Sequence, residues 1–308
     1  MAAGNRLKLG VTLPLTDIGG APETVRRFAR EAEALGYNYL GAPEHVIGVN
    51  VASRPDWDTG RNSSVDMFHD PFVLFGFLSG CTTRIRFSTQ VMILPQRQTA
   101  LVAKQAASLD VLSGGRFRFG VGIGWNSVEY DALNEDFTNR GIRSEEQVEV
   151  MQALWANPHV KFKGRWHDID DAGINPLPLK RAIPLWFGGH KDVTLKRIAK
   201  WGAGWIMLAH PLGPKANAEF AKLKRYTEEA RRDPDEIGIE VWVSTGEGRP
   251  DDWKRTAESW AKSGVTHITV NNVYSRNHNK RISDKSFDGH LRAMEAYWRA
   301  VGDLAGEN

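Results

Sequence analysis

Cysteine is nearly absent from the sequence: Cys81 is the only one among 308 residues. An internal disulfide, and any zinc or iron–sulfur site built on several thiolates, are therefore excluded, and a single thiol fits a reducing compartment. Long apolar runs are also missing. The longest, Pro71–Leu78, falls far short of the ~18 residues of a membrane span, and Met1–Thr16 has no hydrophobic signal core. We expect a cytoplasmic protein with no membrane partner.

The sequence has no excess of one charge that would attract a polyanion. It contains 40 Lys and Arg against 37 Asp and Glu, scattered along the chain, for a formal net charge of +3. This argues against nucleic acid as a partner. Metal-ligand motifs are missing as well: there is no HExxH, and the nine histidines lie far apart. We expect no metal, and a metal-dependent barrel hydrolase is the weakest of the alternatives.

Strand-like and helix-like patterns alternate from one end of the chain to the other, which is the most informative feature present. In Arg84–Leu94, for example, apolar and β-branched residues occupy alternate positions, and a helical stripe follows that Gly114 and Gly115 end. Asp70 and Pro71 form a cap and first-turn pair. Eight strands are predicted: Leu7–Leu13, Asn38–Ala42, Arg84–Leu94, Arg116–Ile123, Ile183–Phe187, Gly204–Leu208, Ile239–Ser244 and Val265–Asn271.

A helix is predicted after each strand, including Ser144–Trp155, Asp192–Trp201 and Phe287–Val301. Eight such units can close a parallel sheet so that no edge strand remains, so we predict a single (β/α)8 TIM barrel over residues 1–308. A doubly wound sheet is the alternative, but Leu13–Leu15 lacks the glycine-rich turn that usually follows its first strand. In a barrel, the functional residues lie at the carboxyl ends of the strands.

Two of these strand ends carry candidates. Glu44 and His45 follow the second strand, where a histidine can exchange a proton near neutral pH and an adjacent carboxylate can tune it; a loop histidine bonded to backbone is the plainer reading. Gln90, Val91 and Met92 lie where the third strand becomes a loop that stays apolar, as in a wall against a flat ligand. On pattern alone, ordinary barrel core is the favoured interpretation of these three residues.

Glycines mark two further strand ends. Gly122 and Gly124 lack the spacing of a dinucleotide fingerprint, but they permit close approach of a ligand to the backbone, with tight packing as the alternative. The segment from Pro184 to Asp192 is a buried strand, a two-glycine turn and a helix start. Free amides at that start can bind a phosphate, although an ordinary turn has the same pattern.

Several motifs in the same order resemble one family, the bacterial luciferase-like flavin and deazaflavin oxidoreductases, especially the branch that uses coenzyme F420. The resemblance covers roughly residues 7–208, and the remainder matches in element order. The matching stretches are Leu9–Pro14, Ala32–Tyr37, Glu44–Val46, Thr82–Gln90, Leu94–Pro95, Ala103–Asp110, Leu112–Arg116, Gly120–Glu129, Pro184–Gly189 and Gly202–Trp205.

The resemblance implies a barrel with a cofactor ring over the carboxyl ends of the strands. It implies a non-prolyl cis peptide between Gln90 and Val91 behind that ring, a catalytic His45, and a homo-oligomer, most simply a dimer. Some relatives carry an acid where Trp125 stands, so their acid–base mechanism does not transfer. The cofactor-binding residues expected on this basis are Glu44, Gln90, Val91, Met92, Gly122, Gly124, Trp125, Asn126, Phe187, Gly188, Gly189 and His190.

We therefore expect an F420-dependent oxidoreductase that transfers a hydride between the deazaflavin and a small organic substrate. An FMN-dependent luciferase-like monooxygenase, or a flavin-binding protein without turnover, are the alternatives. Two long loops, Val46–Asp66 and Asn157–Ala182, are expected to cover the site as lids. Apolar pocket residues are expected from Trp57, Phe68, Trp166 and Trp186. Basic contacts for the acidic tail of F420 are expected from Arg97, Lys191 or the group Lys161, Lys163 and Arg165.

Overall fold

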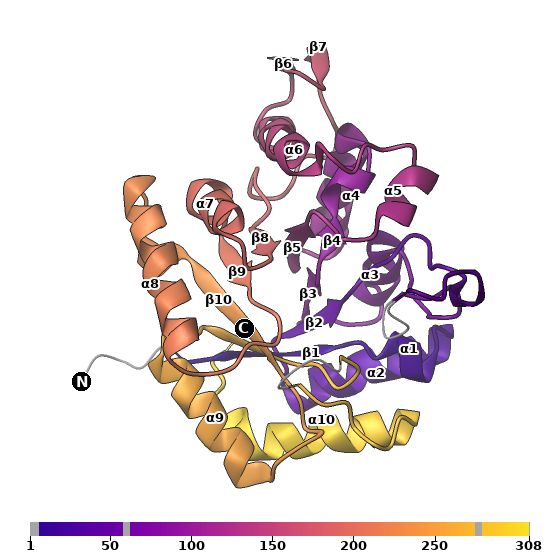
Figure 1. Cartoon of the computed structure of the whole chain (residues 1–308), viewed down its shortest axis with the longest axis vertical. Helices are drawn as coiled ribbons and strands as arrows, with labels where there is room; N and C mark the ends of the chain where they lie inside the picture. Colours follow the sequence, from indigo (N-terminus) through magenta and orange to yellow (C-terminus); the bar gives the residue numbers. More distant parts are fainter. Residues whose placement is uncertain (1–5, 58–61, 275–278, 308) are drawn as a thin grey trace.

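The computed structural model describes residues 6–57, 62–274 and 279–307. Its strands form a closed parallel barrel surrounded by helices, as predicted (Figure 1). The barrel strands are β1 (Lys8–Thr12), β2 (Tyr39–Ala42), β3 (Arg86–Thr89) continued by β4 (Met92–Ile93), β5 (Phe117–Gly122), β8 (Leu185–Gly188), β9 (Gly204–Ile206), β10 (Gly238–Val243) and β11 (His267–Val270). Neighbours follow chain order around the ring, and a β3–β5 pairing closes it.

A helix follows each strand position and packs on the outside of the barrel. The eight are α2 (Pro22–Leu35), α3 (Pro71–Ser79), α4 (Thr99–Leu112), α6 (Arg140–Ala156), α7 (Asp192–Trp201), α8 (Pro214–Glu229), α9 (Pro250–Lys262) and α10 (Phe287–Val301). Shorter helices are α1 (Leu15–Ile18), α5 (Ser127–Ala132), η1 (Val51–Ser53), η2 (Leu94–Gln96), η3 (Pro234–Glu236) and η4 (Gly302–Leu304). The predicted cap is present: Asp70 Oδ1 accepts from the Phe72 amide at 2.9 Å.

The layer between barrel and helices is apolar. Helix α2 buries Val25, Phe28, Ala29 and Ala32 on one stripe, which is why a 3.6-residue period appears in its sequence. Phe75 of α3 stacks on Phe87 of β3 with ring centroids 5.1 Å apart. Each large side chain buried in this layer stabilises the fold by about 1.5–3 kcal/mol. The helices are therefore held by their apolar faces rather than by intrinsic propensity.

The barrel interior contains a buried polar network by contrast. Glu240 of β10 is fully buried and forms an ion pair with Arg118 of β5. It also accepts hydrogen bonds from Gln90 Nε2 at 2.7 Å and from Thr269 Oγ1 at 2.7 Å. Because a buried charge is tolerated only when it is paired and hydrogen-bonded, this network specifies how the inward-facing side chains fit together.

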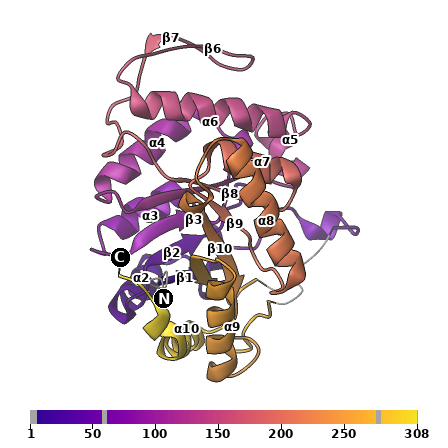
Figure 2. The same ribbon diagram turned by 90° about the vertical axis from the view of Figure 1, so that its left-hand side faces the viewer.

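The predicted lid Asn157–Ala182 is wrong. This segment contains a β-hairpin, β6 (Val160–Lys163) and β7 (Asp168–Ala172), that packs on the outside of α6 (Figures 1 and 2). Glu146 of α6 accepts three backbone N–H bonds from the hairpin tip, at 2.8 to 2.9 Å. The hairpin tip also contacts Thr99 at the start of α4, whose Oγ1 lies 2.6 Å from His167 Nε2. The segment therefore packs on the outer helices rather than over the strand ends.

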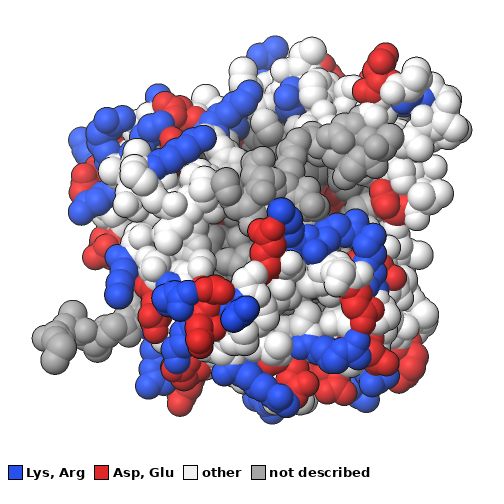
Figure 3. Space-filling model, turned by 60° about the horizontal axis from the view of Figure 1, so that its bottom comes forward, with Lys and Arg blue, Asp and Glu red and all other residues white. Residues whose placement is uncertain are grey.

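The molecular surface carries both signs of charge. On the face drawn in Figure 3, basic and acidic side chains are interspersed around the rim rather than gathered into one basic stripe. No helix in the described part of the chain combines the length and the apolar character needed to cross a bilayer.

Candidate active site

The loops after β2 and β5 meet at the carboxyl end of the barrel through a histidine and a carboxylate. His45 Nδ1 lies 3.1 Å from Glu129 Oε2, and the two residues are 84 positions apart in sequence. The Glu129 side chain is 1% exposed and that of His45 is 18% exposed. The carboxylate of the pair is thus buried, whereas the imidazole is partly exposed at the site.

Glu129 is held as an anion. Burial raises its pKa, but hydrogen bonds from His45 and from the amides of Val46 and Ile47 outweigh this effect and leave the pKa below its usual value. A carboxylate only accepts hydrogen bonds, so the proton of the contact sits on His45 Nδ1. Nε2 of the neutral ring is then an acceptor, and it has no hydrogen-bond partner among the described residues.

Aromatic rings surround this histidine. The His45 ring meets Phe68 edge-on at 5.1 Å and Trp125 at 6.0 Å, and Trp57 lies 5.5 Å from Trp125. Trp57 belongs to the predicted lid Val46–Asp66, so the described part of that loop borders the site. Phe68 follows just after the loop. Residues 58–61 of the loop lie outside the described residues. The arrangement gives an organic ligand an apolar wall.

The peptide bond between Gln90 and Val91 is cis, at the position that the family resemblance implied. The Val91 side chain that follows it packs against two glycines of the neighbouring strands. A Cβ on Gly122 would lie 2.6 Å from Val91 Cγ2, and one on Gly188 would lie 3.0 Å from Val91 Cγ1. Gly124 is similarly close to Ile93. Gly122 and Gly188 therefore leave the space that the Val91 side chain occupies at the mouth of the barrel.

Three predicted cofactor-binding side chains face elsewhere. Gln90 points into the barrel, where Thr12 Oγ1 donates to its Oε1 at 2.8 Å and its Nε2 donates to Glu240. Met92 and Phe187 pack in the apolar layer outside the barrel. Strand pleating explains the outward direction of Phe187, because its neighbour Trp186 faces the barrel interior. Only the backbones of Met92 and Phe187 remain available to a ligand.

Glu44 is a buried carboxylate that binds the backbone of β4 and the Arg97 side chain next to the site. It is 4% exposed, its Oε1 accepts from the Ile93 amide at 2.9 Å, and its Oε2 pairs with Arg97 at 2.5 Å. Burial raises the pKa of Glu44, while Arg97 opposes that effect. Arg97 also pairs with Asp70 at 2.9 Å, so this guanidinium is committed to two carboxylates and is not a contact for an acidic tail.

One polar atom of the Asn126 side chain makes a structural hydrogen bond, and the other has no partner among the described residues. Its Oδ1 caps α5 by accepting from the Val128 amide at 3.0 Å. Its Nδ2 is buried and has no partner among the residues that the structure describes. A buried amide nitrogen without a partner is costly, so this atom marks a place where a bound polar group would be favourable.

The predicted phosphate segment forms a tight turn before α7. Gly189 has a φ of +126°, and its carbonyl accepts from Trp205 Nε1 at 2.7 Å. Lys191 is the residue that caps the helix, and Asp192 in the first turn pairs with Lys222 at 2.9 Å. The amides at the start of a ten-residue helix face this turn. His190 is exposed, with its ring 5.8 Å from that of His210.

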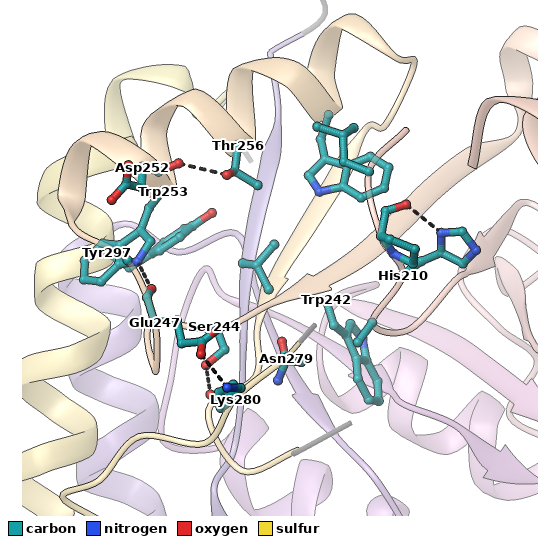
Figure 4. Close-up of a pocket in the computed structure, with 16 residues that line it drawn as sticks. His210, Trp242, Ser244, Glu247, Asp252, Trp253, Thr256, Asn279, Lys280 and Tyr297 are labelled. Atoms are coloured by element: carbon teal, nitrogen blue, oxygen red, sulfur yellow. Dashed lines mark hydrogen bonds and ion pairs between the residues drawn. The ribbon is translucent and has the colours of Figure 1, made fainter. Parts of the chain in front are cut away.

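A cavity of about 410 Å³ opens beside the carboxyl ends of β9 and β10. Figure 4 shows Trp242 and His210 on one side of it, and Trp253 and Tyr297 on the other. Its volume is in the range of small-molecule sites. No sequence signal singled out this cavity, because its walls come from two loops and from α9 and α10, which are far apart in the chain.

The two other expected pocket tryptophans lie away from the mouth. Trp166 is in the hairpin tip outside α6, and Lys161, Lys163 and Arg165 lie on the same hairpin. Trp186 fills the barrel interior with Ile206 and Trp242. Sequence reasoning also missed Glu129, which entered only as the last residue of the matching stretch Gly120–Glu129 and was given no role. Among the described residues, no three His, Cys, Asp or Glu side chains group as metal ligands.

Comparisons with known proteins identify the family of the chain. The sequence model of the family described as "Luciferase-like monooxygenase" matches residues 8–303. An uncharacterised protein of Mycobacterium tuberculosis is 34% identical over 249 residues, which cover 79% of this chain and 82% of that protein.

Two solved structures share the fold. An F420-dependent secondary alcohol dehydrogenase aligns with a TM-score of 0.76 at 17% identity, over 98% of this chain and 100% of that one. The long-chain alkane monooxygenase LadA aligns with a TM-score of 0.77 at 11% identity, over 98% and 93%. By the match of its sequence over almost its whole length, the chain belongs to the luciferase-like monooxygenase family.

Proposed function

We propose that the protein is an F420-dependent oxidoreductase that transfers a hydride between the deazaflavin and a small organic substrate. The observation that carries the proposal is the pair of His45 and Glu129 at the carboxyl end of β2. It stands next to β3, whose end holds Val91 between two glycines. The structural similarity to an F420-dependent alcohol dehydrogenase supports the choice of cofactor.

The residues at the mouth fit a flat ring with a phosphate-bearing chain. Val91 provides a floor, and the absence of side chains on Gly122 and Gly188 makes room for it. The unpartnered Nδ2 of Asn126 offers a donor to a polar group. The amides after Gly189 offer donors to a phosphate, and Lys191 is the basic residue of the expected set that lies beside them. When bound, F420 supplies a ring carbon that accepts or donates a hydride.

In this proposal His45 handles the proton that accompanies the hydride. Glu129 fixes the ring with Nδ1–H donated to the carboxylate, so Nε2 accepts a proton from a substrate hydroxyl or returns it to a carbonyl oxygen. The carboxylate also favours the protonated ring once the proton has arrived. Phe68 and Trp125 lie against the His45 ring and are placed to contact the apolar part of the substrate.

FMN is the second candidate, favoured by the description of the matching family and by the similarity to an alkane monooxygenase. It has a similar ring and a phosphate, and it would let oxygen serve as a substrate. The residues around Val91 and Gly189 suit either ring, so a binding experiment distinguishes the two.

The test is a titration of the purified protein with F420 and, separately, with FMN, followed by absorbance and fluorescence. We expect saturation by F420 near ~1 μM, about −8 kcal/mol, with weaker binding of FMN. Tighter binding of FMN, together with oxygen consumption, would support the monooxygenase instead. If neither cofactor saturates the protein, the proposed function is wrong.

A glycine pair provides the matched control. Gly189→Ala is expected to weaken cofactor binding about tenfold, because a side chain at a φ of +126° strains the turn and its Cβ would lie 3.2 Å from Thr194 Oγ1. Gly264→Ala, at a φ of +97° with open space around it and at the end of α9, should leave cofactor affinity unchanged. Equal weakening in both variants would argue against a phosphate site at Gly189.

A further inference from the structure

The amino end of the barrel contains a second, smaller cavity of about 160 Å³. It is built from the first residues of several strands, since Lys8 of β1 pairs in register with His267 of β11, and Tyr39 of β2 with Arg86 of β3. None of its lining residues is acidic; they are Lys8, Asn38, Tyr39, Arg86, Phe87, Arg118 and His267. It lies at the opposite end of the strands from His45.

Two of the cations around this cavity, Lys8 and Arg86, form no close ion pair among the described residues. Lys8 donates to the Glu307 carbonyl and Arg86 to the Gly115 carbonyl. Only the more distant carboxylates of Glu307 and Asp110 attract them, and they offset part of the effect described next. Lys8 and Arg86 each have a lowered pKa, caused first by burial and then by a neighbouring arginine, Arg86 for Lys8 and Arg118 for Arg86. Burial likewise lowers the pKa of His267 well below its usual value, and the same cations add to the effect. Repulsion among these clustered positive charges therefore lowers the stability of the folded protein when no anion is bound.

Arg118 lines the same cavity and has one unused donor. Its side chain is 9% exposed, its Nε donates to Ser88 Oγ at 3.1 Å, and it forms an ion pair with Glu240. The other terminal nitrogen, Nη1, is buried and has no partner among the described residues. Tyr39 and Trp186 clamp the guanidinium from the ring faces, at 4.4 and 4.1 Å, so its orientation is fixed.

We propose that this cavity, bounded by Lys8, Arg86 and Arg118, is a binding site for a small tetrahedral oxyanion of the phosphate class. An anion would satisfy Arg118 Nη1 and neutralise the two unpaired cations, and guanidinium groups match the geometry of phosphate oxygens. The cavity has the room of about five waters at ~30 Å³ each, which suits phosphate and is too small for a nucleotide. Arg86 is exposed at the rim and gives the anion a way in.

The test is thermal unfolding in chloride and in inorganic phosphate at equal ionic strength. Phosphate should raise the midpoint of the wild-type protein by about 2–4 °C with a saturable dependence. Arg86→Gln should raise the apparent Kd for phosphate at least tenfold, and in chloride it should be at least as stable as the wild type because repulsion is removed. Arg225→Gln, the same charge change on exposed α8, should respond to phosphate as the wild type does.

A parallel titration with methyl phosphate distinguishes two sources of the anion. If it stabilises as well as inorganic phosphate, the site accepts the end of a phosphate ester; if only inorganic phosphate acts, the site takes the free ion. If neither acts, or if Arg86→Gln responds like the wild type, the proposal is wrong.

A crystal soaked in selenate provides a readout that needs no variant. Anomalous density between Arg86 and Arg118 supports the site. Density confined to the start of α7 overturns it, because the stabilisation by phosphate would then come from the carboxyl end.

Discussion

At the carboxyl end of the barrel, His45 and Arg97 each form a close pair with a buried carboxylate. At the amino end, Lys8 and Arg86 approach each other with no carboxylate in a close ion pair among the described residues, and Asp110 attracts Arg86 only from a longer distance. The difference is instructive because both ends are built by the same strands. Where charges are paired, side chains are held in one orientation, as a reacting group requires. Where cations are left unpaired, the protein is less stable alone and better prepared for an anion.

The largest expected effect is on turnover, and it comes from a substitution at the carboxyl end of the barrel. His45→Ala should lower the rate of hydride transfer by ~10²–10⁴-fold, the usual contribution of a positioned acid or base, because no other described group replaces Nε2. Cofactor affinity should change little. Stopped-flow reduction or oxidation of the bound cofactor measures the rate, and a binding titration measures the affinity. Equal loss in rate and in affinity would indicate a binding role for His45 instead.

The next effect concerns the network that lies between the two ends. Glu240→Gln should lower the free energy of unfolding by about 3–5 kcal/mol, because Arg118 would then be a buried cation without its counter-ion. Urea unfolding measures the loss. Glu295→Gln, which removes the exposed partner of Arg299, is the matched control and should change the stability by less than about 1 kcal/mol. Similar losses in the two variants would show that Glu240 is not the counter-ion that the fold needs.

Much of the barrel follows from local sequence patterns, but contacts between distant loops do not. The alternation in Arg84–Leu94 and the pair of Asp70 and Pro71 are local, so they predicted a strand and a helix start that the structure has. The pairing of His45 with Glu129 joins positions 84 residues apart and left no local signal. The same holds for the hairpin β6–β7, which is held by Glu146 of another element.

The outward direction of the Phe187 side chain could be predicted from strand pleating. If Gly188 faces the mouth of the barrel, pleating forces Phe187 outward, so its side chain was never a candidate for the cofactor. Gln90 is different. Its inward direction depends on an irregular strand between β3 and β4, where the alternation rule does not hold, and only the structure reveals that it bonds to Glu240.

A smaller effect is expected from the orientation of the histidine. Glu129→Gln should lower turnover roughly tenfold to a hundredfold, in line with other residues that orient a reacting side chain, because the amide no longer stabilises the protonated ring. Asp136→Asn, on the exposed loop before α6, is the control with the same change of charge and should not affect turnover. The pH dependence of the rate separates the roles: a shifted profile in Glu129→Gln indicates action through His45, and a uniform loss at all pH values contradicts it.

The smallest effect distinguishes the two ends by their response to acid. The folded-state pKa of Glu129 is lowered from its ordinary value of 4.5. Glu129 therefore stabilises the folded protein above pH 4.5, and this stabilisation is lost only as the pH falls below that value. The pKa of His267 is lowered as well, but for a histidine the unfolded chain then binds the extra proton below 6.5, so stability declines from that higher pH. Urea unfolding between pH 7.5 and about 5 should therefore show a flatter profile for His267→Gln than for the wild type. The exposed variant His159→Gln should follow the wild type, and a parallel decline in all three proteins would show that acid does not act on the amino end through His267.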